Sequence, residues 1–178
     1  GLDARLVDAV RSSQGDTFVA DLPRGAGWLL IEMSGTDEAE TLDRAEKLAA
    51  ASGALDHRII PPGAEARSVW RIREDGAGLA GRTSAGNQAW PGFEDAAVPP
   101  ENLGAYLREF DDLTASHGIE GMPYGHFGDG CIHVRLDIPL EQDGSALRSL
   151  MEDAGRLVAK HGGSLSGEHG DGRARSEL

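Results

Sequence analysis

Apolar residues recur every three to four positions in several segments of the chain, which is the spacing of one face of an α-helix. The clearest case runs from Ser145 to Lys160, where leucine, methionine, valine and alanine fall on one side of the predicted helix. Glycine or proline marks an end of several of these segments. The predicted helices cover residues 2–10, 36–53, 64–74, 100–118 and 145–160.

Short apolar runs predict strands between the helices. Residues 28–33 form one such run, and residues 57–60 form another that stops at Pro61-Pro62. With the helix between them, these two runs predict a strand–helix–strand unit. Further strands are expected at residues 93–98, 119–127, 131–138 and 164–166.

The strand at residues 131–138 shows a strict alternation of apolar and other residues. Ile132, Val134, Leu136 and Ile138 are expected on the face that packs into the core. The alternation sends the remaining side chains to the opposite face, and these are Cys131, His133 and Arg135.

The order of these elements predicts the fold class. A helix comes first, then β-α-β-α, a long loop at residues 76–92, and finally β-α-β-β-α-β. Loops of that length in compact domains tend to be functional or disordered. The order predicts an α+β fold with a duplicated ferredoxin-like antiparallel sheet and helices packed on one face.

Length and charge narrow the possible partners and settings. With 178 residues the chain is read as one domain, and its net charge of −13 argues against nucleic acid or an anionic membrane as partner. The single cysteine rules out an internal disulfide framework. Together with the lack of a signal peptide and of a membrane-spanning run, the low cysteine content favours a cytoplasmic location. Because the chain begins at glycine and stops just after a chemically rich motif, we expect an excised part of a longer protein.

Two glycine-rich stretches, residues 124–135 and 166–173, carry the candidate chemistry. They contain His126, His133 and the pair Glu168-His169, and imidazole and carboxylate groups are ligands that suit zinc and similar divalent ions. A Gly-Asp-Gly turn lies between the first two histidines, so flanking strands would bring both rings to the mouth of a hairpin. Two histidines and one carboxylate leave a coordination position open, as catalytic metal sites do.

These residues also have ordinary structural interpretations. A histidine beside glycines in a turn is usually a polar loop residue, and Asp129 and Asp171 are typical of residues that brace turns. A phosphate-binding loop is not predicted, because neither nucleotide-binding glycine pattern occurs with the strand and helix that it requires.

The same motifs carry a family resemblance. Gly-His-Phe-Gly-Asp-Gly-Cys-Ile-His at residues 125–133 and Ser-Gly-Glu-His-Gly-Asp-Gly-Arg at residues 166–173 resemble the C-terminal domain of FAD-linked oxidases. That family includes D-lactate dehydrogenase, the glycolate oxidase FAD subunit and D-2-hydroxyglutarate dehydrogenase. The resemblance covers most of the chain and is closest to large bacterial members that fuse a flavin domain to an iron–sulfur domain. It therefore implies FAD and, in such a parent protein, an iron–sulfur cluster.

The resemblance implies an activity and its partners. A parent enzyme of this family oxidises a D-2-hydroxy acid to the 2-oxo acid and passes hydride to flavin. Most of the flavin site would lie on an N-terminal FAD-binding domain that precedes this chain, so residues 1–178 alone are expected to be inactive. The electron acceptor, the metal and the identity of the hydroxy acid stay open.

The resemblance also implies roles for single residues. His126, His133 and Glu168 would hold a divalent metal such as zinc, and His169 would act as general base. Arg73, in the segment Trp70-Arg71-Ile72-Arg73-Glu74, would bind a substrate carboxylate, for which a guanidinium is well shaped. The substrate-binding residues expected are Arg73 and Arg135.

Three further positions are less informative. Cys131 stands where relatives usually have asparagine and is read as lining the site. Arg173 and Arg175 are candidates for contact with flavin phosphates or with a neighbouring domain. Some relatives place a lysine just before the segment that corresponds to residues 95–99, and this sequence has none there.

An alternative function belongs to another class. The chain would then be a non-catalytic ferredoxin-like module that binds a small ligand or packs between domains, with its glycine-rich loops as contacts. Convergence of His126, His133 and Glu168 favours the enzyme, whereas three separated side chains favour the module.

Overall fold

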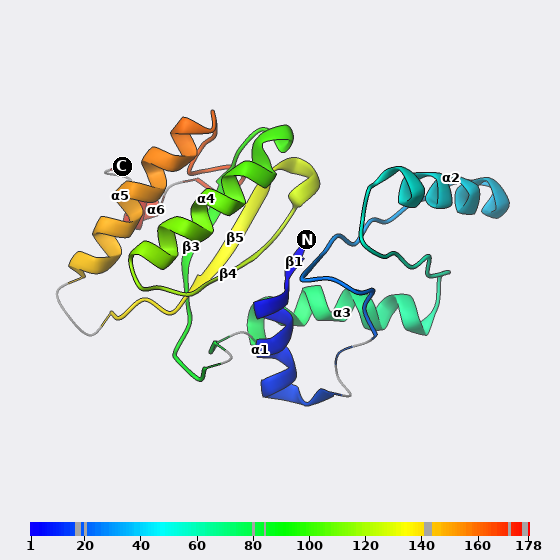
Figure 1. Ribbon diagram of the computed structural model, residues 1–178, viewed down its shortest axis with the longest axis horizontal. Coiled ribbons are helices and arrows are strands. Elements are labelled where there is room, and N and C mark those ends of the chain that lie inside the picture. Colours follow the sequence, from blue (N-terminus) through cyan, green and yellow to red (C-terminus); the bar gives the residue numbers. More distant parts are fainter. Residues whose placement is uncertain are drawn as a thin grey trace.

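Five antiparallel strands form one sheet in the order β2-β1-β4-β5-β3 (Figure 1). The computed structural model describes residues 1–16, 19, 21–79, 81–83, 85–140, 144–170, 172–175 and 178. The predicted α+β class with an antiparallel sheet is confirmed. The strands are β1 (Leu2–Asp3), β2 (Gly27–Trp28), β3 (Trp90–Ala97), β4 (Gly121–Tyr124) and β5 (Cys131–Leu136).

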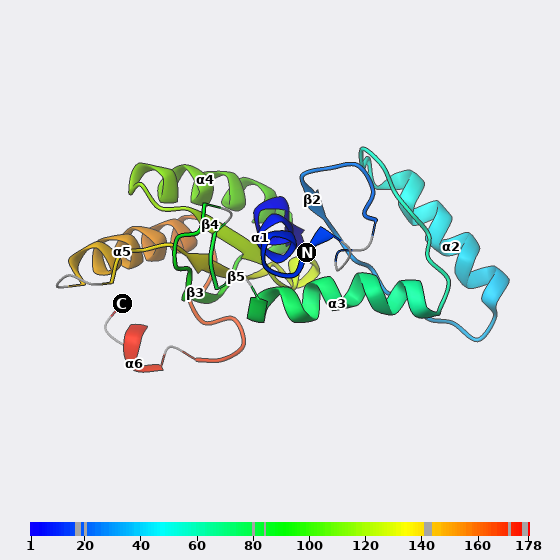
Figure 2. The same ribbon diagram turned by 90° about the horizontal axis from the view of Figure 1, so that it is seen from below.

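Helices lie on both sides of these strands. Figure 2 shows α4 and α5 on one side of β3, β4 and β5, with α3 and α6 on the other. Short 3-10 turns, η2 (Pro100–Asn102) and η3 (Phe127–Asp129), precede α4 and β5. The helices are α1 (Ala4–Gln14), α2 (Glu38–Ala51), α3 (Ala64–Leu79), α4 (Leu103–Ser116), α5 (Ser145–Lys160) and α6 (Gly172–Arg175).

The larger core lies between the sheet and the pair α4 and α5. Phe93 of β3 stacks on Phe110 of α4 with ring centroids 5.1 Å apart, and Leu150 of α5 is fully buried beside them. Burial of each such side chain contributes about 1.5–3 kcal/mol. A second cluster joins α1 to α3 and β4 through Leu6 and Ile72. The two clusters fix β4 and β5 from opposite sides, which makes them a rigid base for a site.

The N-terminal strand–helix–strand unit differs from the prediction. Only Trp28 of the first apolar run joins the sheet, as the second residue of β2, and residues 57–60 lie outside it, between α2 and α3. None of the residues of α2 is buried, and Leu29 and Leu55 are 62% and 79% exposed. Figure 1 shows α2 apart from the sheet. Trp28 and Leu30 pack against the second core cluster, but Leu29 and Ile31 are exposed, and a strand needs neighbouring strands or a covering layer to be stable.

Other boundaries also moved by a few residues. Leu2–Asp3 form β1 between β2 and β4, so the first helix begins only at Ala4. The cap of α2 is Asp37, whose carboxylate accepts from the N–H of Glu40 at 2.8 Å, so the helix begins at Glu38 and not at residue 36. Helix α3 runs to Leu79, which shortens the predicted loop at residues 76–92; residues 80 and 84 of that loop are outside the described part.

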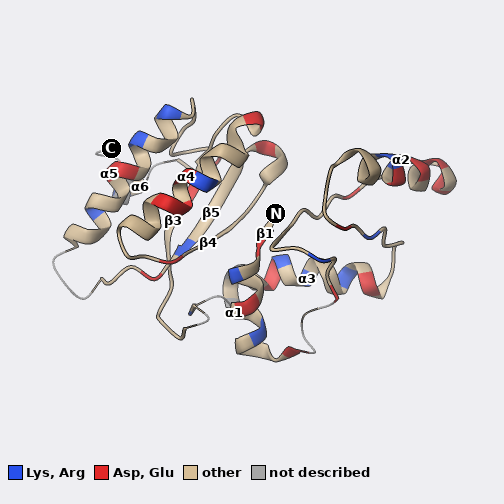
Figure 3. Ribbon diagram, in the orientation of Figure 1, with Lys and Arg blue, Asp and Glu red and all other residues tan. Residues whose placement is uncertain are grey.

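The helix at residues 145–160 is confirmed at both ends. Acidic and basic side chains are interspersed along α1, α3, α4 and α5 (Figure 3). Within the described residues, every helix is too short or too polar to cross a membrane.

Candidate metal and substrate site

The β4–β5 hairpin brings two histidines to one place. Tyr124 pairs with His133 in the ladder between β4 and β5. His126 lies two residues after Tyr124 and immediately before the turn η3. Gly130 closes that turn in a left-handed conformation (φ 72°), which glycine adopts without steric cost. Ile132 and Val134 are fully buried in the core, so His133 lies on the opposite face as the alternation predicted. The two imidazole centroids are 6.0 Å apart.

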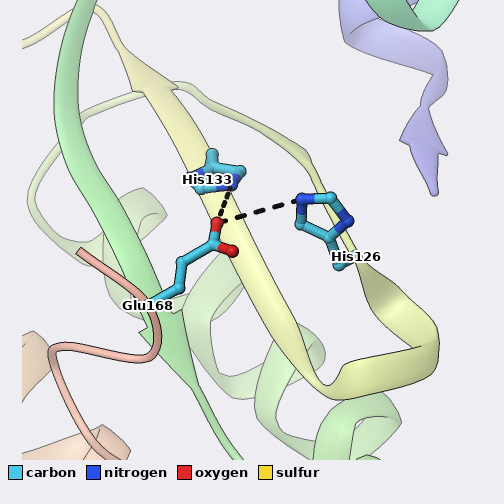
Figure 4. Close-up of side chains that lie close together, drawn as sticks. All are labelled: His126, His133 and Glu168. Carbon is cyan, nitrogen blue, oxygen red and sulfur yellow. Dashed lines mark ion pairs between the residues drawn. The ribbon is translucent and has the colours of Figure 1, made fainter.

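Glu168 reaches the two histidines from a loop near the end of the chain (Figure 4). Its Oε1 lies 3.5 Å from Nε2 of His133 and 3.8 Å from Nε2 of His126. One ligand atom from each of the three residues lies within 4.8 Å of the other two. The structure therefore brings together the three side chains that the motifs singled out.

The spacing of these donors fits a divalent ion. Zinc binds imidazole nitrogen and carboxylate oxygen at about 2.0–2.2 Å with tetrahedral geometry, which separates neighbouring ligand atoms by roughly 3.3 Å. The observed separations of 3.5 and 3.8 Å are close to this value. His126 and Glu168 are partly exposed and His133 is nearly buried, so the group faces solvent on one side. Three protein donors with an accessible side match a catalytic arrangement.

A second carboxylate orients His133. Oε2 of Glu94, on β3, lies 3.0 Å from Nδ1 of His133, on the other side of the ring from Glu168. This hydrogen bond is the main cause that raises the pKa of His133, against the lowering effect of burial. A proton held on Nδ1 leaves Nε2 directed at the candidate metal position, the usual arrangement behind a metal-bound histidine.

A cavity of about 350 Å³ opens beside this group. Arg73 extends into it from α3, and its Nη2 lies 3.4 Å from Nε2 of His126. Arg135, on the same face of β5 as His133, hydrogen-bonds to the phenol of Tyr124 in the cavity wall. The cavity lining consists of Arg73, Glu74, Glu94, Tyr124, His133 and His169.

His169 stands next to the candidate metal ligands. Its Nε2 lies 3.3 Å from Oε1 of Glu168, and its ring centroid is 6.2 Å from that of His133. The imidazole also lines the cavity, so it is placed to exchange a proton with a molecule bound there.

Comparison with known proteins identifies the family of this chain. Residues 2–178 match the family described as FAD linked oxidases, C-terminal domain. The chain belongs to this family.

Three relatives illustrate the similarity. The chain is 32% identical to D-2-hydroxyglutarate dehydrogenase of Escherichia coli (strain K12), over 87% of this chain and 16% of that protein. It is 30% identical to the Pseudomonas putida protein of the same name, over 97% of this chain and 18% of that protein. It is 29% identical to D-lactate dehydrogenase of Archaeoglobus fulgidus, over 99% of this chain and 38% of that protein. The chain thus spans less than two fifths of each of these relatives.

In this member of the FAD-linked oxidase family, Cys131 is buried at the edge of the site. Its Sγ lies 3.9 Å from Oδ1 of Asp95, and burial, followed by the charge of Glu168, raises its pKa to about 11. This agrees with the interpretation that Cys131 lines the site.

The remaining candidate positions give less information. The backbone N–H of Asp129 donates to the carbonyl of His126 within the turn η3, so Asp129 is part of that turn. Arg173 is exposed at the start of α6. Asp171 and the side chain of Arg175 lie outside the described part of the chain.

Sequence reasoning missed two site residues, Glu94 and Asp95. Glu94 contacts His133, and Asp95 is fully buried and accepts hydrogen bonds from the loop that carries Glu168. A signal was present, since two adjacent acids in a largely apolar strand are unusual. Their order in the sequence did not indicate which histidine or loop they would reach.

Proposed function

We propose that this chain is the substrate- and metal-binding domain of an FAD-dependent enzyme that oxidises a D-2-hydroxy acid to the 2-oxo acid. The flavin would be held mainly by an N-terminal domain of the same parent chain. The observation that carries the proposal is the convergence of His126, His133 and Glu168 next to the cavity that Arg73 and His169 line. This convergence favours an enzyme over a non-catalytic packing module.

Each residue of the site has its own role in the proposed reaction. Arg73 binds a substrate carboxylate through two parallel N–H donors. His126, His133 and Glu168 would hold a divalent ion such as zinc, which would supply Lewis-acid polarisation of the substrate oxygens. Arg135, which contacts Tyr124 in the cavity wall, is the second proposed substrate-binding residue.

The oxidation removes one proton and one hydride from the substrate. The O–H bond of the substrate breaks, and Nε2 of His169 accepts the proton as general base. The C2–H bond breaks with its electron pair, and the pair left on oxygen forms the carbonyl of the 2-oxo acid. FAD supplies the acceptor for that hydride.

The named relatives indicate the substrate class. They act, by name, on D-2-hydroxyglutarate and D-lactate, which share a carboxylate and a neighbouring hydroxyl. Arg73 and the candidate metal position suit that shared pair of groups. We therefore propose the class of D-2-hydroxy acids, with D-lactate, glycolate and D-2-hydroxyglutarate as the compounds to compare.

The test is metal analysis and turnover of the full-length flavoprotein, with and without His126→Ala. We expect bound divalent metal in the wild type, its loss in the variant, and a fall in kcat of about a hundredfold or more, because Lewis-acid stabilisation contributes several kcal/mol. His117→Ala is the matched control, since His117 pairs with Asp153 at 3.0 Å between α4 and α5. Unchanged turnover in His126→Ala would remove the metal from the mechanism.

A further inference from the structure

A β-bulge in β3 lies directly under the candidate site. The pairing of β3 with β5 shifts register between Phe93 and Ala96, and the residues at the shift are Glu94 and Asp95. Asp95 has φ 76°, and no other non-glycine residue in the described part of the chain has a positive φ. Bulges re-aim side chains next to active sites. A left-handed aspartate persists only where its surroundings hold it, so its contacts need an explanation.

Both carboxylate oxygens and the carbonyl of Asp95 bind the loop that carries Glu168 and His169. Its Oδ1 accepts from the N–H of Glu168 and its Oδ2 accepts from the N–H of His169, both at 2.8 Å. Its carbonyl accepts from the N–H of Gly167, also at 2.8 Å. Three successive backbone N–H groups of the loop therefore bind one residue of β3.

Little else positions the two functional side chains of this loop. The side chains of Glu168 and His169 are 43% and 65% exposed, so core packing does not hold them. Asp95 itself is fully buried. Hydrogen bonds from backbone N–H to a carboxylate are among the stronger ones in proteins. The placement of both side chains thus depends on the anchoring of their backbone.

An alternative role for Asp95 is that of a metal ligand, since its carboxylate lies within 4.8 Å of ligand atoms of Glu168 and His169. Both of its oxygens, however, already accept backbone N–H groups at 2.8 Å. One acceptor site on each oxygen is therefore engaged, and Asp95 is fully buried beneath the loop. The geometry favours an anchor over a ligand.

We infer that Asp95 is a positioning residue. It holds the backbone of Glu168 and His169 so that the carboxylate of Glu168 meets His126 and His133, and so that the imidazole of His169 faces the cavity. The inference rests on the proposed function for what these two side chains do, but the anchoring itself can be measured without metal or substrate.

The first test is Asp95→Asn in the full-length flavoprotein. Asparagine tolerates a positive φ, so the bulge is kept, but one acceptor oxygen becomes an N–H₂ donor. Asp137→Asn is the matched control, because Oδ1 of Asp137 accepts from the N–H of Glu120 at the opposite end of β5. A second variant, Gly167→Ala, displaces the loop without changing Asp95, since its Cβ would lie 2.8 Å from Cβ of Ala97.

Hydrogen exchange of the metal-free protein is measured first, on peptides that span residues 163–170. We expect exchange there to be about tenfold faster or more in Asp95→Asn and in Gly167→Ala, because bonds to a charged acceptor are lost. Asp137→Asn should leave these peptides unchanged. Unchanged exchange in both site variants would overturn the anchoring role.

Zinc affinity is measured next, by competition with a chelator. We expect it to be about 10- to 100-fold weaker in both site variants, as for other residues that orient metal ligands, and within about twofold of wild type in Asp137→Asn. Faster exchange with undiminished zinc affinity would overturn the claim that anchoring sets the position of Glu168. A wild type that binds no zinc would refute the proposed metal function, while the exchange result would still decide whether Asp95 anchors the loop. If Asp95→Asn unfolds, Gly167→Ala decides the outcome.

Discussion

Glu94 and Glu168 lie on opposite sides of the His133 ring, and Oε2 of Glu94 is 3.0 Å from Nδ1 while Oε1 of Glu168 is 3.5 Å from Nε2. The imidazole is therefore oriented by one carboxylate and presented to the other. The ring is nearly buried against β3 and Tyr124, with the centroids of His133 and Tyr124 5.4 Å apart. A histidine held in this way has one free nitrogen in a fixed direction, which is what a metal ligand requires.

Glu94→Gln is therefore expected to weaken zinc binding by about 10- to 100-fold, because it removes the charge that holds the Nδ1 proton. Glu74→Gln is the control, since Glu74 lines the same cavity and its substitution changes the local charge equally. Chelator competition on both purified variants measures the effect. Equal zinc affinities for the two variants would show that charge in the cavity matters and that the contact with His133 does not.

Arg73→Lys is expected to lower kcat/KM for the hydroxy acid by about 10- to 100-fold, mainly through KM. Lysine keeps the charge but loses the two-point donor geometry, and a hydrogen bond to a charged group contributes about 1.5–3 kcal/mol. Steady-state kinetics of the full-length flavoprotein measures this change. Arg71→Lys is the control, because Arg71 pairs with Asp75 at 3.5 Å along the same helix. A similar KM in both variants would argue against a substrate contact at Arg73.

The hairpin half of the site could be predicted from the sequence. Alternation in β5 placed His133 opposite the core, and the Gly-Asp-Gly turn placed His126 beside it. These are local relationships, and strand geometry determines them. The approach of Glu168 is a long-range contact, and only the pairing of the two glycine-rich motifs suggested it.

The roles of Glu94 and Asp95 could not be predicted in this way. Regular alternation would send two adjacent residues to opposite faces of β3, whereas the bulge and the positive φ of Asp95 bring both to the site. Aspartate adopts the left-handed conformation more often than most residues, but the sequence does not indicate which aspartate does so. The apolar run at residues 28–33 failed for a different reason. Its pattern is that of a strand, but most of it has no covering layer in the fold.

The contact between α4 and α5 is expected to weaken in acid. Oε2 of Glu109 lies 2.5 Å from Nζ of Lys160, and this pairing, followed by His161, lowers the pKa of Glu109 below its ordinary value of 4.5. A lowered carboxylate pKa means that the folded protein binds the proton less readily than the unfolded chain. The stabilisation is therefore complete above about pH 5 and is lost as pH falls through the folded-state pKa.

Urea unfolding of wild type and Glu109→Gln at several pH values tests this expectation. The variant should lose part of the decrease in unfolding free energy below pH 4.5, and salt should reduce the difference because the pair is exposed. Glu46→Gln is the control, since it lies in α2, apart from α4 and α5. Parallel pH curves for wild type and Glu109→Gln would show that the pair adds nothing to stability.

The turn between the two candidate histidine ligands depends on one of its glycines. A Cβ on Gly130 would lie 1.8 Å from the carbonyl oxygen of Val98, and the residue has φ 72°, whereas a Cβ on Gly128 would meet no atom within 4 Å. Gly130→Ala is therefore expected to cost about 2 kcal/mol or more, since the left-handed conformation alone costs about 1–2 kcal/mol. Gly128→Ala should change stability by less than about 0.5 kcal/mol. Chemical unfolding of the two variants measures the difference, and zinc affinity should follow it, because displacement of Gly130 moves His126 relative to His133. If both variants unfold at the same urea concentration, the close contact between this turn and Val98 is absent in solution.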